Sequence, residues 1–152
     1  MKIIAHRGNL DGPCPETENN PEQINKCLDF GYDVEVDVRW DPATDRIWLG
    51  HDDAQNMVSW YWLANRSQYL WVHCKDIATL HAFSTKTSGY NYFWHQNDDY
   101  ALTSKHNIWS YPNQTYTSNT VIVMPELNNL SSDLLKVTNC FGICSDYPQR
   151  YR

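Results

Sequence analysis

At 152 residues the chain is long enough to bury its own apolar core, so we expect one domain over residues 1–152. Its net charge of −6 disfavours a nucleic-acid partner, because phosphate backbones attract positive surfaces. No apolar run reaches the roughly 18 residues of a membrane span, and the short apolar start does not resemble a signal peptide, so we expect a cytoplasmic protein.

The beginning of the chain predicts a strand and then a helix. The apolar run Lys2 to Ala5 predicts a strand that leads into a His-Arg-Gly sequence. After a polar loop, Asn20 has the position of an N-cap, Pro21 that of the first helical residue and Gln23 that of a capping box. Gly31 is the expected stop, so the helix is predicted between residues 21 and 30.

The next apolar run carries two carboxylates on one face. Val34 to Val38 alternates with period two, which places Glu35 and Asp37 side by side. Carboxylates so placed repel each other unless a cation or a basic group lies between them. A solvent-facing edge would also account for them. A third strand at Ile47 to Leu49, which leads into Gly-His51-Asp, favours a metal site instead.

Further strands and helices are predicted down the rest of the chain. We expect strands over residues 69–75, 90–94, 107–110, 121–124 and 141–144, a helix capped by Asp76, and short helices within residues 57–64 and 131–136. On the fourth strand, Trp71, His73 and Lys75 share a face. The helix after Asp76 is expected to carry its apolar residues 77, 80 and 83 along one side.

A strand followed by a helix or a loop, eight times over, predicts an α/β fold with a parallel sheet. We therefore expect a compact TIM-type (β/α)8 barrel with shortened or missing outer helices, since such barrels usually have about 250 residues. The alternative is an open, doubly wound sheet. It is disfavoured because no Gly-rich phosphate loop follows the first strand.

Six short motifs in chain order point to one family. They are His6-Arg7-Gly8, Glu18-Asn19-Asn20, Glu35-Val36-Asp37-Val38, His51-Asp52, His73-Cys74-Lys75 and a Gly142-to-Pro148 segment that contains Asp146. Together they make the chain similar to a reduced-size glycerophosphodiester phosphodiesterase. That family lies within the group of barrel phosphodiesterases that also includes phosphatidylinositol-specific phospholipases C. The match is dense through residue 52 and sparse between residues 76 and 140.

The resemblance implies a metal-dependent hydrolase of a glycerophosphodiester or a similar small alcohol phosphodiester, with a role in lipid metabolism. It makes His6 and His51 the general base and general acid, without fixing which is which. It makes Arg7 and Lys75 the groups that bind phosphoryl oxygens. Glu18 is expected either to ligate the metal or, as we favour, to orient Arg7 or contact the substrate. The implied metal ligands are Glu35, Asp37 and His73.

Predicted strand ends place further residues on the same rim. They are candidates for contacting the part of the substrate beyond the phosphate, although each could equally be a packing residue. This set contains Trp94 and Trp109, which we take as the first candidates, and His95, Gln96, Tyr111, Glu126 and Asp146.

His73 stands where the family has a carboxylate. Imidazole is neutral and softer, so the site loses one negative charge. The cofactor is expected to be a divalent cation, Mg²⁺, Ca²⁺ or Mn²⁺, with His73 favouring Mn²⁺, Zn²⁺ or another transition ion. The alternative is that His73 only fills space or contacts substrate, and that metal binds poorly.

Two other functions remain open at this stage. One is a non-catalytic module that binds a phosphodiester or a sugar phosphate on the same scaffold. The other is a phospholipase of the same barrel group, which is disfavoured because no amphipathic or basic membrane-binding segment is present. The expected partner is a small-molecule phosphodiester. A homodimer is a further expectation, since a thin outer layer would leave apolar barrel surface uncovered.

Overall fold

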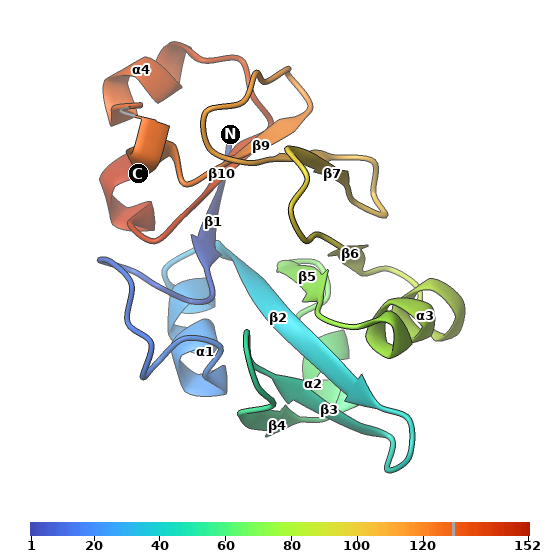
Figure 1. The fold of residues 1–152 in the computed structure, drawn as a ribbon. Coiled ribbons are helices and arrows are strands. Elements are labelled where there is room, and N and C mark those ends of the chain that lie inside the picture. Colours follow the sequence, from blue (N-terminus) through green and yellow to red (C-terminus); the bar gives the residue numbers. More distant parts are fainter. Residues whose placement is uncertain (129) are drawn as a thin grey trace.

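The computed structural model describes residues 1–128 and 130–152. Within these ranges ten strands form one mixed sheet, which curls into a half-barrel (Figure 1). Seven strands run parallel in the order β6-β5-β2-β1-β10-β9-β8. These are β1 (Lys2–His6), β2 (Asp33–Asp41), β5 (Leu70–Cys74), β6 (Asn91–Phe93), β8 (Ile108–Ser110), β9 (Thr120–Val123) and β10 (Gly142–Ser145). Three more, β3 (Arg46–Leu49), β4 (Asn56–Val58) and β7 (Tyr100–Leu102), add to it in antiparallel ladders.

The expected TIM-type (β/α)8 barrel is wrong. The predicted third strand, β3, runs antiparallel to β2, because residues 42–45 make a turn that pairs Asp41 with Arg46. A parallel crossover needs about a dozen residues or more, so this connection cannot supply one. The described chain has only four α-helices, and none lies between β6 and β9: α1 (Pro21–Asp29), α2 (Trp60–Ala64), α3 (Ile77–Lys86) and α4 (Ser132–Val137).

The helices cover the outer face of the sheet in two groups. On one side α1, α2 and α3 contribute Ile24, Leu63 and Phe83 to a cluster that packs against the valines of β2. On the other side α4 and the short 3-10 helix η2 (Pro148–Tyr151) place Leu135 and Tyr151 against β9 and β10. A second 3-10 helix, η1 (Pro125–Asn128), follows β9. These two clusters lie outside the curl, and a third, smaller apolar cluster lies inside it, where Ile4, Val121 and Val123 pack with aromatic rings.

The first helix begins where predicted. The side chain of Asn20 accepts hydrogen bonds from the backbone N–H groups of Glu22 and Gln23, and Pro21 is its first residue. Gly31 follows the end of the helix with φ +86°, a conformation that favours glycine. The expected capping box does not form, because the amide of Gln23 donates to the carbonyl oxygen of Gly8 instead, at 2.9 Å. This bond ties α1 to the turn that follows β1.

The helix after Asp76 packs part of the predicted side against the core: Leu80 and Phe83 lie against it, whereas Ile77 does not. Ile77 is 73% exposed, whereas Thr79, Ala82 and Phe83 are buried. The cause is a polar contact: the backbone N–H of Trp40 donates to Oγ1 of Thr79 at 2.7 Å. This bond fixes the rotation of α3 against the end of β2.

Side chains connect the two ends of the parallel run. In the described residues no backbone ladder joins β6 to β8. The side-chain amide of Asn91 donates to Oδ1 of Asn107 at 3.4 Å, and the rings of Phe93 and Trp109 lie 4.6 Å apart. Trp71 packs on Trp109 at 5.8 Å. These rings form an aromatic floor inside the curl, below the carboxyl ends of the strands.

Candidate active site

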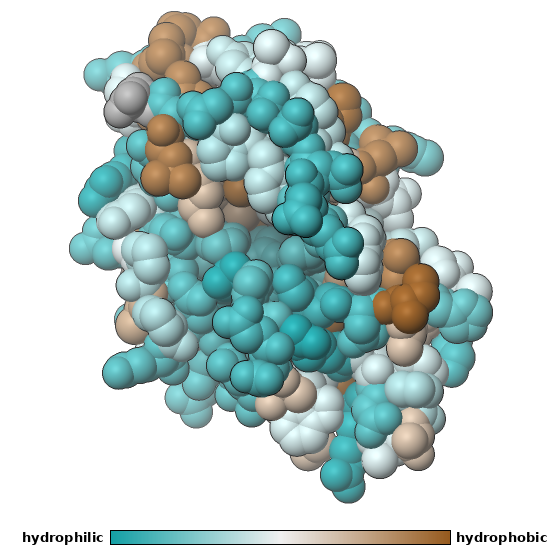
Figure 2. Space-filling view, viewed as in Figure 1, coloured by the Kyte–Doolittle hydropathy of each residue, from teal (hydrophilic) through white to brown (hydrophobic). Residues whose placement is uncertain are grey.

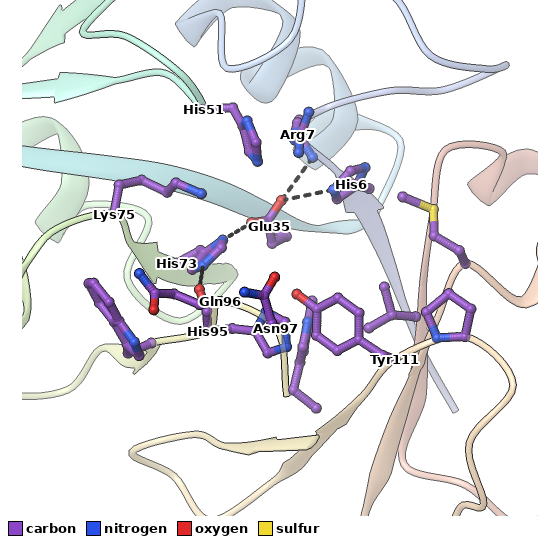
Figure 3. A pocket seen from close by; sticks show the side chains of 15 residues that line it. His6, Arg7, Glu35, His51, His73, Lys75, His95, Gln96, Asn97 and Tyr111 are labelled. Atoms are coloured by element: carbon purple, nitrogen blue, oxygen red, sulfur yellow. Dashed lines mark hydrogen bonds and ion pairs between the residues drawn. The ribbon is translucent and has the colours of Figure 1, made fainter. Parts of the chain in front are cut away.

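The carboxyl ends of the parallel strands open into a cleft of about 620 Å³. Figure 2 shows a hollow on this face with mostly hydrophilic surroundings, and Figure 3 shows its lining. Of the ten residues predicted for the site, eight line the cleft: His6, Arg7, Glu35, His51, His73, Lys75, Trp94 and Trp109. The other two, Glu18 and Asp37, lie behind Arg7 and beneath His73, in contact with them.

Glu35, Asp37 and His73 form a compact cluster. One ligand atom from each lies within 4.8 Å of the other two. The parallel register of β2 and β5 produces this arrangement, because it pairs Asp37 with His73 directly. Nδ1 of His73 lies 3.1 Å from Oδ1 of Asp37 and 3.7 Å from Oε1 of Glu35. All three residues are buried, so their charges interact strongly.

The donor set fits a divalent cation. Oδ1 of Asp37 is buried and its neighbours are basic groups, Nδ1 of His73 at 3.1 Å and Nζ of Lys75 at 3.6 Å, so it lies where a cation would be bound. Nε2 of His73 lies 3.2 Å from the carbonyl oxygen of His95. A proton on Nε2 leaves Nδ1 as the ligand atom, which is the usual arrangement for a metal-bound histidine. Two carboxylates and one imidazole suit Mn²⁺ or Zn²⁺.

Without a cation, His73 itself balances the carboxylates. Burial opposes the charged imidazole, but hydrogen bonding and attraction from Asp37 and Glu35 outweigh it and raise the pKa of His73 to about 9. Burial likewise opposes ionisation of Asp37, yet His73, Arg7 and Lys75 hold its pKa well below the usual range. A metal bound here therefore has to displace the proton on Nδ1.

Asn19, the middle residue of the second motif, fixes the carboxylate of Asp37. Its side-chain amide donates to Oδ2 of Asp37 at 2.9 Å, and its Oδ1 accepts from the backbone N–H of Asp37 at 2.9 Å. Asn19 has φ +57°, a conformation that asparagine adopts more readily than most residues. The paired contact holds Oδ2 and leaves Oδ1 directed at His73.

His6, at the end of β1, is held by Asp146. Its Nδ1 lies 2.8 Å from Oδ1 of Asp146, and its Nε2 lies 3.9 Å from Oε2 of Glu35 (Figure 3). Burial opposes the imidazolium, but the hydrogen bond to Asp146 and the charge of Glu35 outweigh it and raise the pKa of His6. The amide of Asn9 donates to both Asp146 and Glu18, at 2.7 and 2.9 Å. Asp146, a rim candidate from the sequence, thus contacts a histidine.

His51 enters the cleft from the loop after β3. Its Nδ1 lies 2.7 Å from Oδ1 of Asp52. The guanidinium of Arg39, on β2, donates to the carbonyl oxygens of Gly50, His51 and Asp52 and so holds the loop. Gly50 has φ +153°, and a Cβ there would lie 1.9 Å from the carbonyl oxygen of Asp53, so only glycine fits. Arg39 was not predicted from the sequence, because its partners lie in the loop after β3, more than ten residues further along the chain.

Two cations converge on the cluster. Nη1 of Arg7 donates to Glu18 at 3.2 Å, and its Nε lies 3.3 Å from Oδ2 of Asp37. Nζ of Lys75 lies 3.6 Å from Oδ1 of Asp37. The structure places Glu18 outside the cleft lining, where it fixes the guanidinium of Arg7. Arg7 therefore contacts one oxygen of the Asp37 carboxylate and Lys75 the other, and both side chains line the cleft.

The opposite wall comes from the loops after β6 and β8. His95 stacks on Tyr111 with ring centroids 3.6 Å apart. Trp109 is 3% exposed and serves mainly as floor, whereas Trp94 is only partly buried. Asn97, which sequence reasoning did not select, lies beside Gln96 on this wall. Glu126 lies away from the cleft and accepts hydrogen bonds from Ser145 and the backbone of Asp146.

Comparison with protein-family models, with curated proteins and with solved structures found no match. The function of the chain is therefore inferred from the geometry of the cleft and from the motif resemblance. None of the helices in the two described ranges has the length and apolar character needed to cross a bilayer.

Proposed function

We propose that this chain is a metal-dependent phosphodiesterase that hydrolyses a glycerophosphodiester or a similar small alcohol phosphodiester. One observation carries the proposal: two histidines, His6 and His51, reach one cleft from different strand ends, above a buried carboxylate–imidazole cluster that two cations flank (Figure 3). Phosphodiester cleavage needs a base, an acid and positive charge at the non-bridging oxygens, and this cleft offers all three.

The chain's own residues divide the work as follows. Arg7 and Lys75 bind non-bridging phosphoryl oxygens, Arg7 through its planar fork and Lys75 as a point charge. One of the two histidines accepts the proton of the attacking hydroxyl, and the other donates a proton to the leaving oxygen. Asp146 on Nδ1 of His6 leaves Nε2 free to face the cleft.

Glu35, Asp37 and His73 would hold the cation. When bound, a divalent cation supplies charge neutralisation at the phosphate and polarises it toward attack. In the resembling family, the hydroxyl adjacent to the ester attacks first and water then opens the cyclic product. We extend that sequence to this chain as part of the proposal.

One observation favours a second candidate, a non-catalytic module that binds a phosphodiester or a sugar phosphate. With His73 protonated, the cluster needs no metal to balance its charge, and Arg7 and Lys75 alone could retain an anion. A binding module has no use for a base and an acid. Substitution of His51 by alanine therefore separates the two: a binder keeps its affinity, whereas an enzyme loses turnover and still binds.

The test is a phosphorus NMR time course. Protein stripped of metal and reloaded with Mg²⁺, Ca²⁺, Mn²⁺ or Zn²⁺ is offered a mixture of glycerophosphodiesters, with His6→Ala and His51→Ala as controls and circular dichroism to verify folding. Glycerol phosphate or its cyclic form, absent with both variants, is the expected result. Absence of turnover with every metal by folded protein would contradict the proposal and favour the binding module.

A further inference from the structure

The two walls of the cleft differ in chemistry. The wall built by β1, β2 and β5 carries Arg7, Lys75 and the carboxylate cluster, which suit the phosphate. The facing wall comes from the loops after β6 and β8 and contains Trp94, Gln96, Asn97 and Tyr111. A diester held at the first wall presents one of its alcohols to the second. The second wall therefore decides which alcohol is accepted.

The second wall offers neutral hydrogen-bonding groups. Gln96 and Asn97 are exposed, and within the described ranges their amides, the indole N–H of Trp94 and the hydroxyl of Tyr111 make no hydrogen bond to protein. In Figure 3 the Asn97 amide and the Tyr111 hydroxyl point into the cleft. Amides both donate and accept, which matches the hydroxyl groups of a polyol.

The loop that carries these groups is fixed to the cluster. Nε2 of His73 lies 3.2 Å from the carbonyl oxygen of His95, and Nε2 of His95 lies 2.5 Å from the carbonyl oxygen of Asp98. The stacking of His95 on Tyr111 joins the two loops. The amides therefore project from an anchored backbone, so binding through them costs less ordering entropy.

An ammonium group finds little to bind on this wall. Glu35 is the one carboxylate among the residues that line the cleft, and it faces His6 and His73. Asp98 and Asp99 follow the amides in sequence but do not line the cleft, and Asp99 accepts a hydrogen bond from Gln114. Arg7 and Lys75 add repulsion toward a cationic head group.

An aromatic cage for a quaternary ammonium is also missing from the described part of the cleft. One face of Tyr111 is covered by His95. Trp109 is almost fully buried, with Trp71 and Phe93 packed against it. Trp94 and the uncovered side of Tyr111 are the partly exposed rings left on this wall, whereas recognition of such cations uses several rings around one charge.

From these observations we infer that the alcohol facing the second wall, the one besides the glycerol of the proposed substrate, is a neutral polyol such as a second glycerol or a cyclitol, and that Gln96 and Asn97 select it over ammonium-bearing alcohols. This inference rests on the proposed function, since it assigns the substrate class of the same cleft. The experiment measures binding as well as turnover, so that the substrate preference and the proposed hydrolysis can fail separately.

The test uses four diesters of glycerol phosphate that differ only in the second alcohol: glycerol, inositol, ethanolamine and choline. Dissociation constants are measured by calorimetry with metal-loaded His6→Ala protein, and kcat/KM with the unsubstituted protein. The variant Q96A/N97A is compared with Gln68→Ala, an exposed amide just before the amino end of β5, whereas the cleft lies at the carboxyl ends of the strands.

We expect the glycerol and inositol diesters to bind and react better than the ammonium diesters by roughly tenfold or more. In Q96A/N97A that preference is lost mainly through KM, while Gln68→Ala retains it. Equal or better use of the ethanolamine or choline diester overturns the inference and leaves the proposed function intact. A polyol preference in binding without turnover supports the inference and contradicts the proposed hydrolysis. No binding of any diester overturns both.

Discussion

Nδ1 of His6 and Oδ1 of Asp146 lie 2.8 Å apart, although 140 residues separate them in the sequence. The ladder between β1 and β10 brings them together, because it pairs Ala5 with Ser145, one residue before each. Since Nδ1 is engaged by the carboxylate, Nε2 is the nitrogen that faces the cleft. Asp146 therefore acts as a positioning residue for His6 in the proposed reaction.

Substitution of Asp146 by asparagine should lower both activity and the pKa of His6. Asp146 raises that pKa by hydrogen bonding to the imidazolium, so its removal lets burial lower it. We expect kcat/KM to fall by roughly a hundredfold or more, because the imidazole loses its tautomer and orientation. An NMR titration of the His6 ring measures the pKa directly. Asp133→Asn is the control, since Asp133 is an exposed carboxylate on α4 that pairs with Lys136; an unchanged His6 titration with full activity in the Asp146 variant would contradict the assignment.

Replacement of His73 by glutamate should change the metal preference. The unsubstituted cluster, with two carboxylates and an imidazole, is expected to bind Zn²⁺ and Mn²⁺ more tightly than Ca²⁺. His73→Glu adds a hard oxygen ligand and a negative charge, which favours Ca²⁺ and Mg²⁺. It also removes the contact of Nε2 with the carbonyl oxygen of His95, so the loop at residues 94–98 should loosen. Calorimetric titration of the metal-stripped proteins measures the order of metal affinities in the unsubstituted chain and in the variant. Tighter binding of Ca²⁺ than of Mn²⁺ by the unsubstituted chain would refute this prediction.

The metal-free protein should lose stability as the pH rises from about 6.5 to 9. The folded-state pKa of His73, about 9, lies above its ordinary value of 6.5. Its contribution is therefore fully present below pH 6.5 and is lost as the pH rises through 9. The loss is of the order of 3 kcal/mol at most. Urea unfolding with a chelator present measures it at each pH.

The matched variant for this experiment is His73→Gln, which cannot titrate. It should show a much flatter dependence, with the remaining slope due mainly to His6, whose pKa is also raised. An equally steep loss in the variant would show that other groups are responsible.

Asn19 should contribute more to stability than its neighbour Asn20. Asn19→Ala leaves the buried backbone N–H and Oδ2 of Asp37 without these partners, which costs about 1–3 kcal/mol for each such group. Asn20→Ala removes an N-cap, at about 1 kcal/mol. Urea unfolding compares the two. Asn19→Gly separates the side-chain contacts from the backbone requirement at φ +57°, because glycine adopts that conformation freely. Equal costs for Asn19→Ala and Asn20→Ala would contradict the proposed role.

The sequence alone was sufficient to predict most of the local elements and many of the residues that line the candidate cleft. Period-two alternation predicted β2 and placed Glu35 and Asp37 on one face. The Asn-Pro pair predicted the start of α1, and Asp76 that of α3. These signals depend only on residues close together in the sequence, so they can be recognised before the tertiary structure is known. The edge strands β4 and β7 were missed, since each is defined by pairing with a single neighbouring strand, which its own residues do not indicate.

Only the tertiary structure decided how these elements combine. The number of strands suggested a closed barrel, but the direction of β3 depends on the length of one turn, and the gap between β6 and β8 depends on side chains that meet across it. Asp146 beside His6 and Arg39 on the His51 loop depend on pairing between distant segments. No local pattern encodes such pairings, because they follow from the register of strands whose order in the sheet differs from their order in the chain.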